Sequence, residues 1–298
     1  MARADGVIER FITTDGTLRL SAVICTKVIE ETRNIHNSFP VATAALGRSL
    51  IGAGLLASFL KNKGRIGLYF KGDGPLGPVF AEGDFSGQVR GFASFPQIHL
   101  PSKSGKLDVG GAVGKGVLSV ATSTVDNKKP YIGTVPLQSG EIGDDIAHYL
   151  FQSQQVPSVV ALGVFIEADN SVGAAGGTIL QAMPGVKEIT LKTLEERVKQ
   201  MHTVTELIKA GGTTSDLAYE VLEDFNFRKL DERTALQFAC HCSSKRVERS
   251  LLLLGEVELQ ALVDRNIDAE VNCDFCGRKY LVDLNTLKGL LSLSKKRV

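Results

Sequence analysis

Four of the five cysteines lie near the C-terminus as two close pairs, Cys240-x-Cys242 and Cys273-x-x-Cys276. Two such thiolate pairs supply the four ligands of a tetrahedral zinc ion when the fold brings them together. The first pair is tighter than the usual spacing in structural zinc sites, where about two to four residues separate the ligands. The sequence therefore predicts one Zn²⁺ per chain in the reduced state, bound by Cys240, Cys242, Cys273 and Cys276.

The segment that carries these cysteines, residues 231–298, is short for a domain with a single hydrophobic core. Domains below about 70–80 residues are often marginal without a metal or another staple. Structural zinc contributes an apparent 10–16 kcal/mol in zinc-finger peptides, whereas a whole domain is typically stable by about 5–15 kcal/mol. Loss of the metal is therefore expected to unfold this segment.

The same cysteines also predict redox chemistry, because thiolates are nucleophiles that peroxide converts through sulfenic acids to disulfides. Partners that are close in sequence meet without long-range order, so we expect Cys240 to pair with Cys242 and Cys273 with Cys276 after metal release. A purely structural zinc site is the alternative. Permanent disulfides do not suit a cytosolic protein. We expect Cys25 to be a buried, inert thiol and His241 to stay outside the ligand set.

The rest of the chain predicts an α+β fold with a largely antiparallel sheet and helices packed on one side. Apolar and alternating runs cut by glycine turns fill residues 1–180, with helices expected at Val41–Lys61 and Ile142–Gln155. A charged helical pattern follows and extends to about Arg233. We predict an N-terminal α+β body over 1–180, a helical linker over 181–230 and a small zinc-binding domain over 231–298.

Composition and charge exclude several classes of protein. The formal net charge is +1, so no global charge attracts nucleic acid or anionic membrane. The segment from Val41 to Leu60 has the length of a membrane span, but it contains Arg48 and many small residues, so we interpret it as a buried core helix. The N-terminus lacks the apolar run of a signal peptide. We predict a cytoplasmic protein that binds neither membrane nor nucleic acid.

Other motifs give weaker signals. The stretch from Gly110 to Gly116, "GGAVGKG", departs from a phosphate loop at both ends, since Val109 and Gly116 replace the required glycine and hydroxyl residue. A glycine-rich hairpin explains it better. Basic residues in "SSKRVER" and "SLSKKRV" suggest the main rival, a zinc-stapled nucleic-acid-binding protein. A second rival is an enzyme with its site in the body, although no catalytic residues stand out, so we expect no enzyme.

The stretches "CHCSSKRVERSLLLLGEVEL", "VNCDFCGRKYLVD" and "FKGDGPLGPVFAEGDFSGQVRGF" resemble the 33 kDa chaperonin family, and the resemblance extends along nearly the whole chain. It implies a redox-regulated, ATP-independent holdase chaperone of bacteria that responds to oxidative and heat stress. The four zinc ligands of the family match Cys240, Cys242, Cys273 and Cys276. Oxidation is then expected to unfold the zinc domain together with the linker. The active form, a homodimer, would hold unfolding client proteins.

Overall fold

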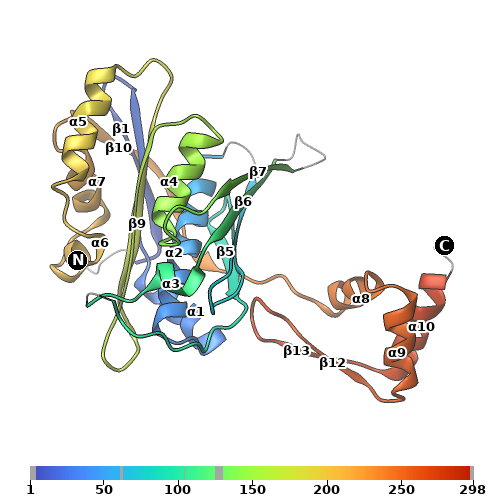
Figure 1. Cartoon of the computed structure of the whole chain (residues 1–298). Coiled ribbons are helices and arrows are strands. Elements are labelled where there is room, and N and C mark those ends of the chain that lie inside the picture. Colours follow the sequence, from blue (N-terminus) through green and yellow to red (C-terminus); the bar gives the residue numbers. More distant parts are fainter. Residues whose placement is uncertain (1–4, 61–62, 104, 125–129, 296–298) are drawn as a thin grey trace. The chain divides into compact units, whose positions relative to one another are not determined.

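The computed structural model describes residues 5–60, 63–103, 105–124 and 130–295 (Figure 1). Contacts divide the chain into two compact units, Met1–Ala239 and Cys240–Val298, called here the first unit and the C-terminal unit. The boundary between them comes directly before the first cysteine of the pairs. The predicted border at 230/231 falls instead within a strand of the first unit. The division into body, linker and zinc domain by function stays a prediction.

The first unit contains two sheets. The larger one has, in spatial order, β11 (Gln237–Phe238), β5 (Gln88–Ala93), β4 (Val79–Asp84), β3 (Arg65–Gly72), β6 (Gly116–Ser123) and β7 (Tyr131–Pro136). The smaller one has β10 (Phe227–Ala235), β1 (Val7–Thr13), β2 (Leu18–Ile24), β9 (Val172–Ala182) and β8 (Ser158–Ile166). Neighbouring strands are antiparallel, except that β11 runs parallel to β5. The predicted α+β class with largely antiparallel pairing is confirmed.

Helix α2 (Pro40–Ala57) contacts both sheets, packing against β4 and β5 on one side and β8 and β9 on the other. Within the described part of the chain, α2 has the length and apolar composition of a helix that could cross a membrane. However, 89% of this helix is buried inside the protein. Small residues line much of its surface, which lets both sheets approach its backbone. The expectation of a buried core helix at this position is confirmed.

One consequence concerns Gly83 on β4, which lies against the α2 backbone. A Cβ atom at this position would come within 2.7 Å of the Ala53 carbonyl oxygen. We expect Gly83→Ala to lower the free energy of unfolding by about 1–2 kcal/mol, because neither backbone can yield easily. Urea unfolding of the purified variant measures the change. Gly67→Ala on the neighbouring strand is the matched control, since its Cβ would meet the Phe80 ring at an ordinary 3.5 Å.

Helices cover both faces of the five-stranded sheet, so the expected arrangement with helices on one side is wrong. Alternate residues of β2 point to opposite faces, and they enter two separate cores: Val23 joins the α2 side, whereas Leu20 and Ala22 join the other. The second core is closed by α5 (Glu188–Val198), α6 (Val204–Lys209) and α7 (Thr214–Leu222) (Figure 1). The segment predicted as a helical linker thus contains three packed helices.

The remaining elements of the first unit show where the sequence patterns succeeded and failed. Helix α4 (Gly143–Gln152) occupies the predicted position, while α1 (Thr26–His36) and the short α3 (Val109–Val113) were not predicted. The helical pattern expected up to Arg233 is wrong at its end, because β10 pairs with β1 there. The pair Asp126-Asn127, whose residue types predict a turn, lies outside the described residues.

The C-terminal unit is a small α+β unit whose elements are α8 (Ser244–Leu252), α9 (Glu256–Asp264), β12 (Ala269–Asn272), β13 (Lys279–Val282) and α10 (Leu284–Lys295). The two strands form an antiparallel hairpin. Its buried cluster has seven residues: Val247, Leu251, Leu259, Val282, Leu287, Leu290 and Leu291. Such a core is small for independent stability, which agrees with the expected need for a staple.

Candidate metal centre

The fold brings the four C-terminal cysteines together at one point. One sulfur atom from each lies within 4.8 Å of all the others. The Sγ atoms of Cys240 and Cys273 are 3.7 Å apart, and those of Cys242 and Cys276 are 3.4 Å apart. A tetrahedron with Zn–S bonds of about 2.3 Å has sulfurs roughly 3.8 Å apart. The four sulfurs therefore fit the donor set and the size of a zinc site.

Local backbone structure places the second pair. The Gly277 amide donates to the Cys273 carbonyl oxygen at 2.8 Å, and the Cys273 amide donates to the Arg278 carbonyl oxygen at 2.9 Å. Gly277 has φ +68°, a left-handed conformation that glycine adopts without a steric penalty. The turn points the Arg278 amide at the Cys276 sulfur. A glycine turn of this form directly after a Cys-x-x-Cys pair is typical of a zinc knuckle.

The sulfurs differ in electrostatic environment. Burial alone would raise the pKa of the Cys242 thiol, but hydrogen bonds from Tyr280 and from the neighbouring thiols outweigh it and lower the pKa to about 7. Burial and the neighbouring thiols raise the pKa of Cys276 to about 12. Burial also raises the pKa of Cys240. The hydrogen bond from Tyr280 and those from the neighbouring thiols therefore favour the thiolate form of Cys242.

Other residues considered from the sequence lie elsewhere. Cys25 is fully buried at the start of α1 in the first unit, as expected, and burial raises the pKa of its thiol far above the ordinary range. His241 is exposed and is not part of the four-sulfur group. Sequence reasoning missed Tyr280, whose hydroxyl lies 3.0 Å from the Cys242 sulfur. The alternation of the strand that follows the second cysteine pair could have indicated it.

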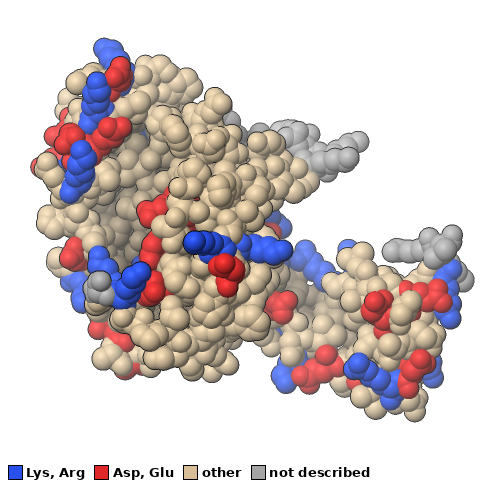
Figure 2. Space-filling model, viewed as in Figure 1, with Lys and Arg blue, Asp and Glu red and all other residues tan. Residues whose placement is uncertain are grey.

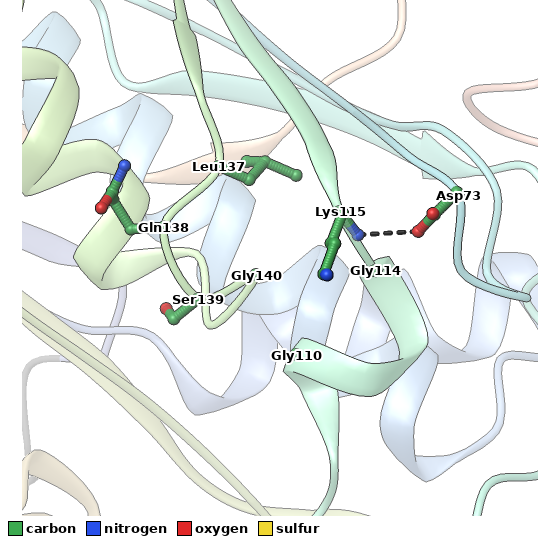
Figure 3. A pocket seen from close by; sticks show the side chains of 8 residues that line it. All are labelled: Asp73, Gly110, Gly114, Lys115, Leu137, Gln138, Ser139 and Gly140. Atoms are coloured by element: carbon green, nitrogen blue, oxygen red, sulfur yellow. Dashed lines mark hydrogen bonds between the residues drawn. The ribbon is translucent and has the colours of Figure 1, made fainter.

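The glycine-rich stretch at Gly110–Gly116 lines a cavity of about 440 Å³ in the first unit (Figure 3). It forms helix α3 and a turn into β6, and not the expected hairpin. Backbone amides that could bind a phosphate instead donate hydrogen bonds to carboxylates of the chain itself. Gly110 donates to Glu141 at 3.0 Å, and Lys115 donates to Asp73 at 2.7 Å. These contacts leave the stretch with a structural role.

The basic residues that suggested nucleic-acid binding are interspersed with acidic ones. Lys245, Arg246 and Arg249 are exposed on α8, with Glu248 between them. Figure 2 shows blue and red side chains side by side on the visible face of the C-terminal unit. Of the second basic stretch, residues 296–298 lie outside the described part of the chain. This face does not form the one-sign surface that binds a phosphate backbone.

Comparison with known proteins identifies relatives that match nearly the whole chain. The family model described as Hsp33 protein matches residues 6–283. The 33 kDa chaperonin of Desulforamulus reducens is 43% identical over 285 residues, which cover 95% of this chain and 96% of that protein. The 33 kDa chaperonin of Geobacter sulfurreducens is 41% identical over 273 residues, covering 92% of this chain and 90% of that protein.

A solved structure is similar along nearly the whole chain. The crystal structure of the 33 kDa chaperonin (heat shock protein 33 homolog) from Thermotoga maritima has a TM-score of 0.88 and 31% sequence identity. The match covers 98% of this chain and 99% of that one. Fold, cysteine cluster and sequence all agree, and the chain belongs to the Hsp33 family of chaperones.

Proposed function

We propose that this chain is a redox-regulated, ATP-independent holdase. In its reduced state, Cys240, Cys242, Cys273 and Cys276 would hold one zinc ion that staples the C-terminal unit. The observation that carries the proposal is the four-sulfur group, because its donor set and spacing suit zinc while its thiolates remain open to oxidation. The bound metal supplies charge neutralisation and crosslinking, and the thiols supply the redox chemistry.

Oxidation is proposed to remove the staple. Each disulfide forms when two thiolates give up two electrons to one hydrogen peroxide, which takes two protons from solvent and is reduced to two water molecules. We propose the pairs Cys240 with Cys242 and Cys273 with Cys276, since partners close in sequence stay close after the unit loosens. Sulfurs joined in disulfides no longer offer thiolate ligands, so metal is released. The small core of the C-terminal unit would then be insufficient to hold its fold.

Client binding is proposed to follow from exposed apolar surface. Helices α5, α6 and α7 cover the face of the five-stranded sheet that includes Leu18, Leu20 and Ala22. Helix α5 buries little apolar surface, because Leu194 is its one buried residue, while Ile189 is 66% exposed. We propose that residues 181–230 unfold together with the C-terminal unit and that apolar surface released in this way holds unfolding proteins. By the family resemblance, the active form is a homodimer in the cytoplasm.

The test is a light-scattering assay on a thermally unfolding client protein without ATP. We expect peroxide-treated protein to suppress aggregation and reduced protein to have little effect, because only the oxidised form exposes the apolar surface. Zinc release and free thiols should be followed in the same samples. Of the five free thiols, four should be lost on oxidation, and the buried thiol of Cys25 should remain.

Two outcomes would contradict the proposal. Equal suppression by reduced and oxidised protein would exclude a redox switch. Salt-sensitive binding of RNA by the reduced form would favour the rival zinc-stapled nucleic-acid-binding protein. Dithiothreitol added after peroxide is the control, and it should restore both the thiols and, with added zinc, the inactive state.

A further inference from the structure

The hydroxyl of Tyr280 distinguishes one of the four sulfurs from the others. It donates a hydrogen bond to the Cys242 Sγ atom over 3.0 Å, and the two residues are 38 positions apart in the chain. Among the described residues, Cys242 is the one sulfur of the cluster that accepts from a side-chain hydroxyl. Arg278 in turn interacts with the Tyr280 hydroxyl. The Tyr280 contact therefore links Cys242 of the first pair to the hairpin that follows the second pair, without requiring a metal ion.

The fold holds Tyr280 firmly in this position. Alternation along β13 directs Tyr280 and Val282 to the same face of the hairpin, while Leu281 between them is 72% exposed. Tyr280 is paired across the hairpin with Val271, and its ring packs against the core of the C-terminal unit. Cys242 comes from a separate segment, directly before the N-cap residue of α8, Ser243. The hydrogen bond thus joins the hairpin to the segment that precedes α8.

We propose that Tyr280 is a positioning residue of the switch, which orients Cys242 and restrains its reaction with oxidants while the site is loaded. The inference rests on the proposed zinc function. A hydrogen-bond donor withdraws electron density from a metal-bound thiolate, which makes the sulfur a weaker nucleophile, and contacts of this kind tune metal sites strongly. The hydroxyl therefore sets how much oxidant is needed before the first cysteine pair reacts.

The test uses the full-length, zinc-loaded Tyr280→Phe variant, which keeps the ring and its packing. We expect alkylation of Cys242 by iodoacetamide to become roughly tenfold faster, in the range that loss of a contact to a metal ligand produces. Zinc release in peroxide should accelerate with it. Mass spectrometry follows each cysteine separately, and a chromogenic chelator follows the metal. Tyr219→Phe, at an exposed tyrosine of α7, is the matched control and should behave as the parent.

The pattern across the four cysteines separates positioning from a merely structural role. Faster alkylation confined to Cys242 supports the proposal, whereas an equal increase at all four, or none, overturns it. A parent protein that carries no zinc overturns the metal site and this inference together, so the two failures are distinguishable. A measurement without any variant is also decisive: the Tyr280 hydroxyl proton should exchange slowly in NMR spectra of the reduced parent, and rapid exchange contradicts the hydrogen bond.

Discussion

Cys273→Ser should release zinc and unfold the C-terminal unit even under reducing conditions. Serine is a poor ligand for zinc, and the remaining three thiolates lose much of an apparent binding free energy of about 10–16 kcal/mol. The seven-residue core of the unit cannot replace that contribution. Metal content under chelator challenge measures the first effect, and hydrogen exchange along the chain measures the second. Residues before 181 should keep their protection, because the core around α2 does not depend on the helices of 181–230. Residues 181–230 should lose protection together with the C-terminal unit, as proposed above.

Cys25→Ala is the control for this prediction. Cys25 is fully buried in the first unit and lies outside the four-sulfur group, so its loss should leave the zinc content unchanged. A Cys273→Ser protein that retained metal as tightly as the parent would show that Cys273 is not a ligand. Zinc loss without unfolding would show that the C-terminal unit needs no staple.

Glu9→Ala should loosen the attachment of α7 to the sheet. Glu9 on β1 is 5% exposed, and its carboxylate accepts a hydrogen bond from Thr214, the first residue of α7. It also forms ion pairs with Lys229 at 2.6 Å and with Arg233 at 3.3 Å, both on β10. We expect the free energy of unfolding to fall by about 2–3 kcal/mol. This is less than the usual effect of breaking a buried ion pair, because the basic partners of Glu9 stay partly solvated. Urea unfolding measures this loss.

The effect should depend on pH in a defined direction. Burial would raise the pKa of Glu9, but hydrogen bonds from Lys229 and Thr214 and the charges of Lys229 and Arg233 outweigh it, so the pKa is lowered in the folded state. A lowered carboxyl pKa stabilises the fold above the unfolded value of about 4.3, and that contribution is lost as the pH falls through the folded pKa. The difference in the free energy of unfolding between the parent and the Glu9→Ala variant should therefore be largest at pH 7 and shrink below about pH 4.

A matched substitution separates this site from charge removal in general. Glu188 forms an exposed ion pair with Lys192 on α5, where the two side chains are 81% and 65% exposed. Glu188→Ala should change stability little at any pH, because water screens such pairs. If Glu9→Ala unfolded in urea like the parent at pH 7, the carboxylate would have no role in attaching α7.

The sequence predicted the grouping of the four cysteines better than the fold around them. Cysteine spacing is a local property, and the chemistry of four thiolates near one another leaves few alternatives, so Cys240, Cys242, Cys273 and Cys276 could be grouped without a structure. The apolar, small-residue stretch of α2 likewise indicated a buried helix. By contrast, β10 has the charged sequence "FRKLDERTA", and its pairing with β1 depends on a partner more than 200 residues away.

What the sequence alone determined is the four-cysteine group, the α+β class and the family, because these follow from residue types and local patterns. Only the tertiary structure decided that α2 lies between two sheets, that α5, α6 and α7 close a second core, and that the first unit extends to Ala239. It also placed the Tyr280 hydroxyl on Cys242. The physical reason is that strand pairing and side-chain contacts between distant segments depend on the whole packed chain, and no local pattern encodes them.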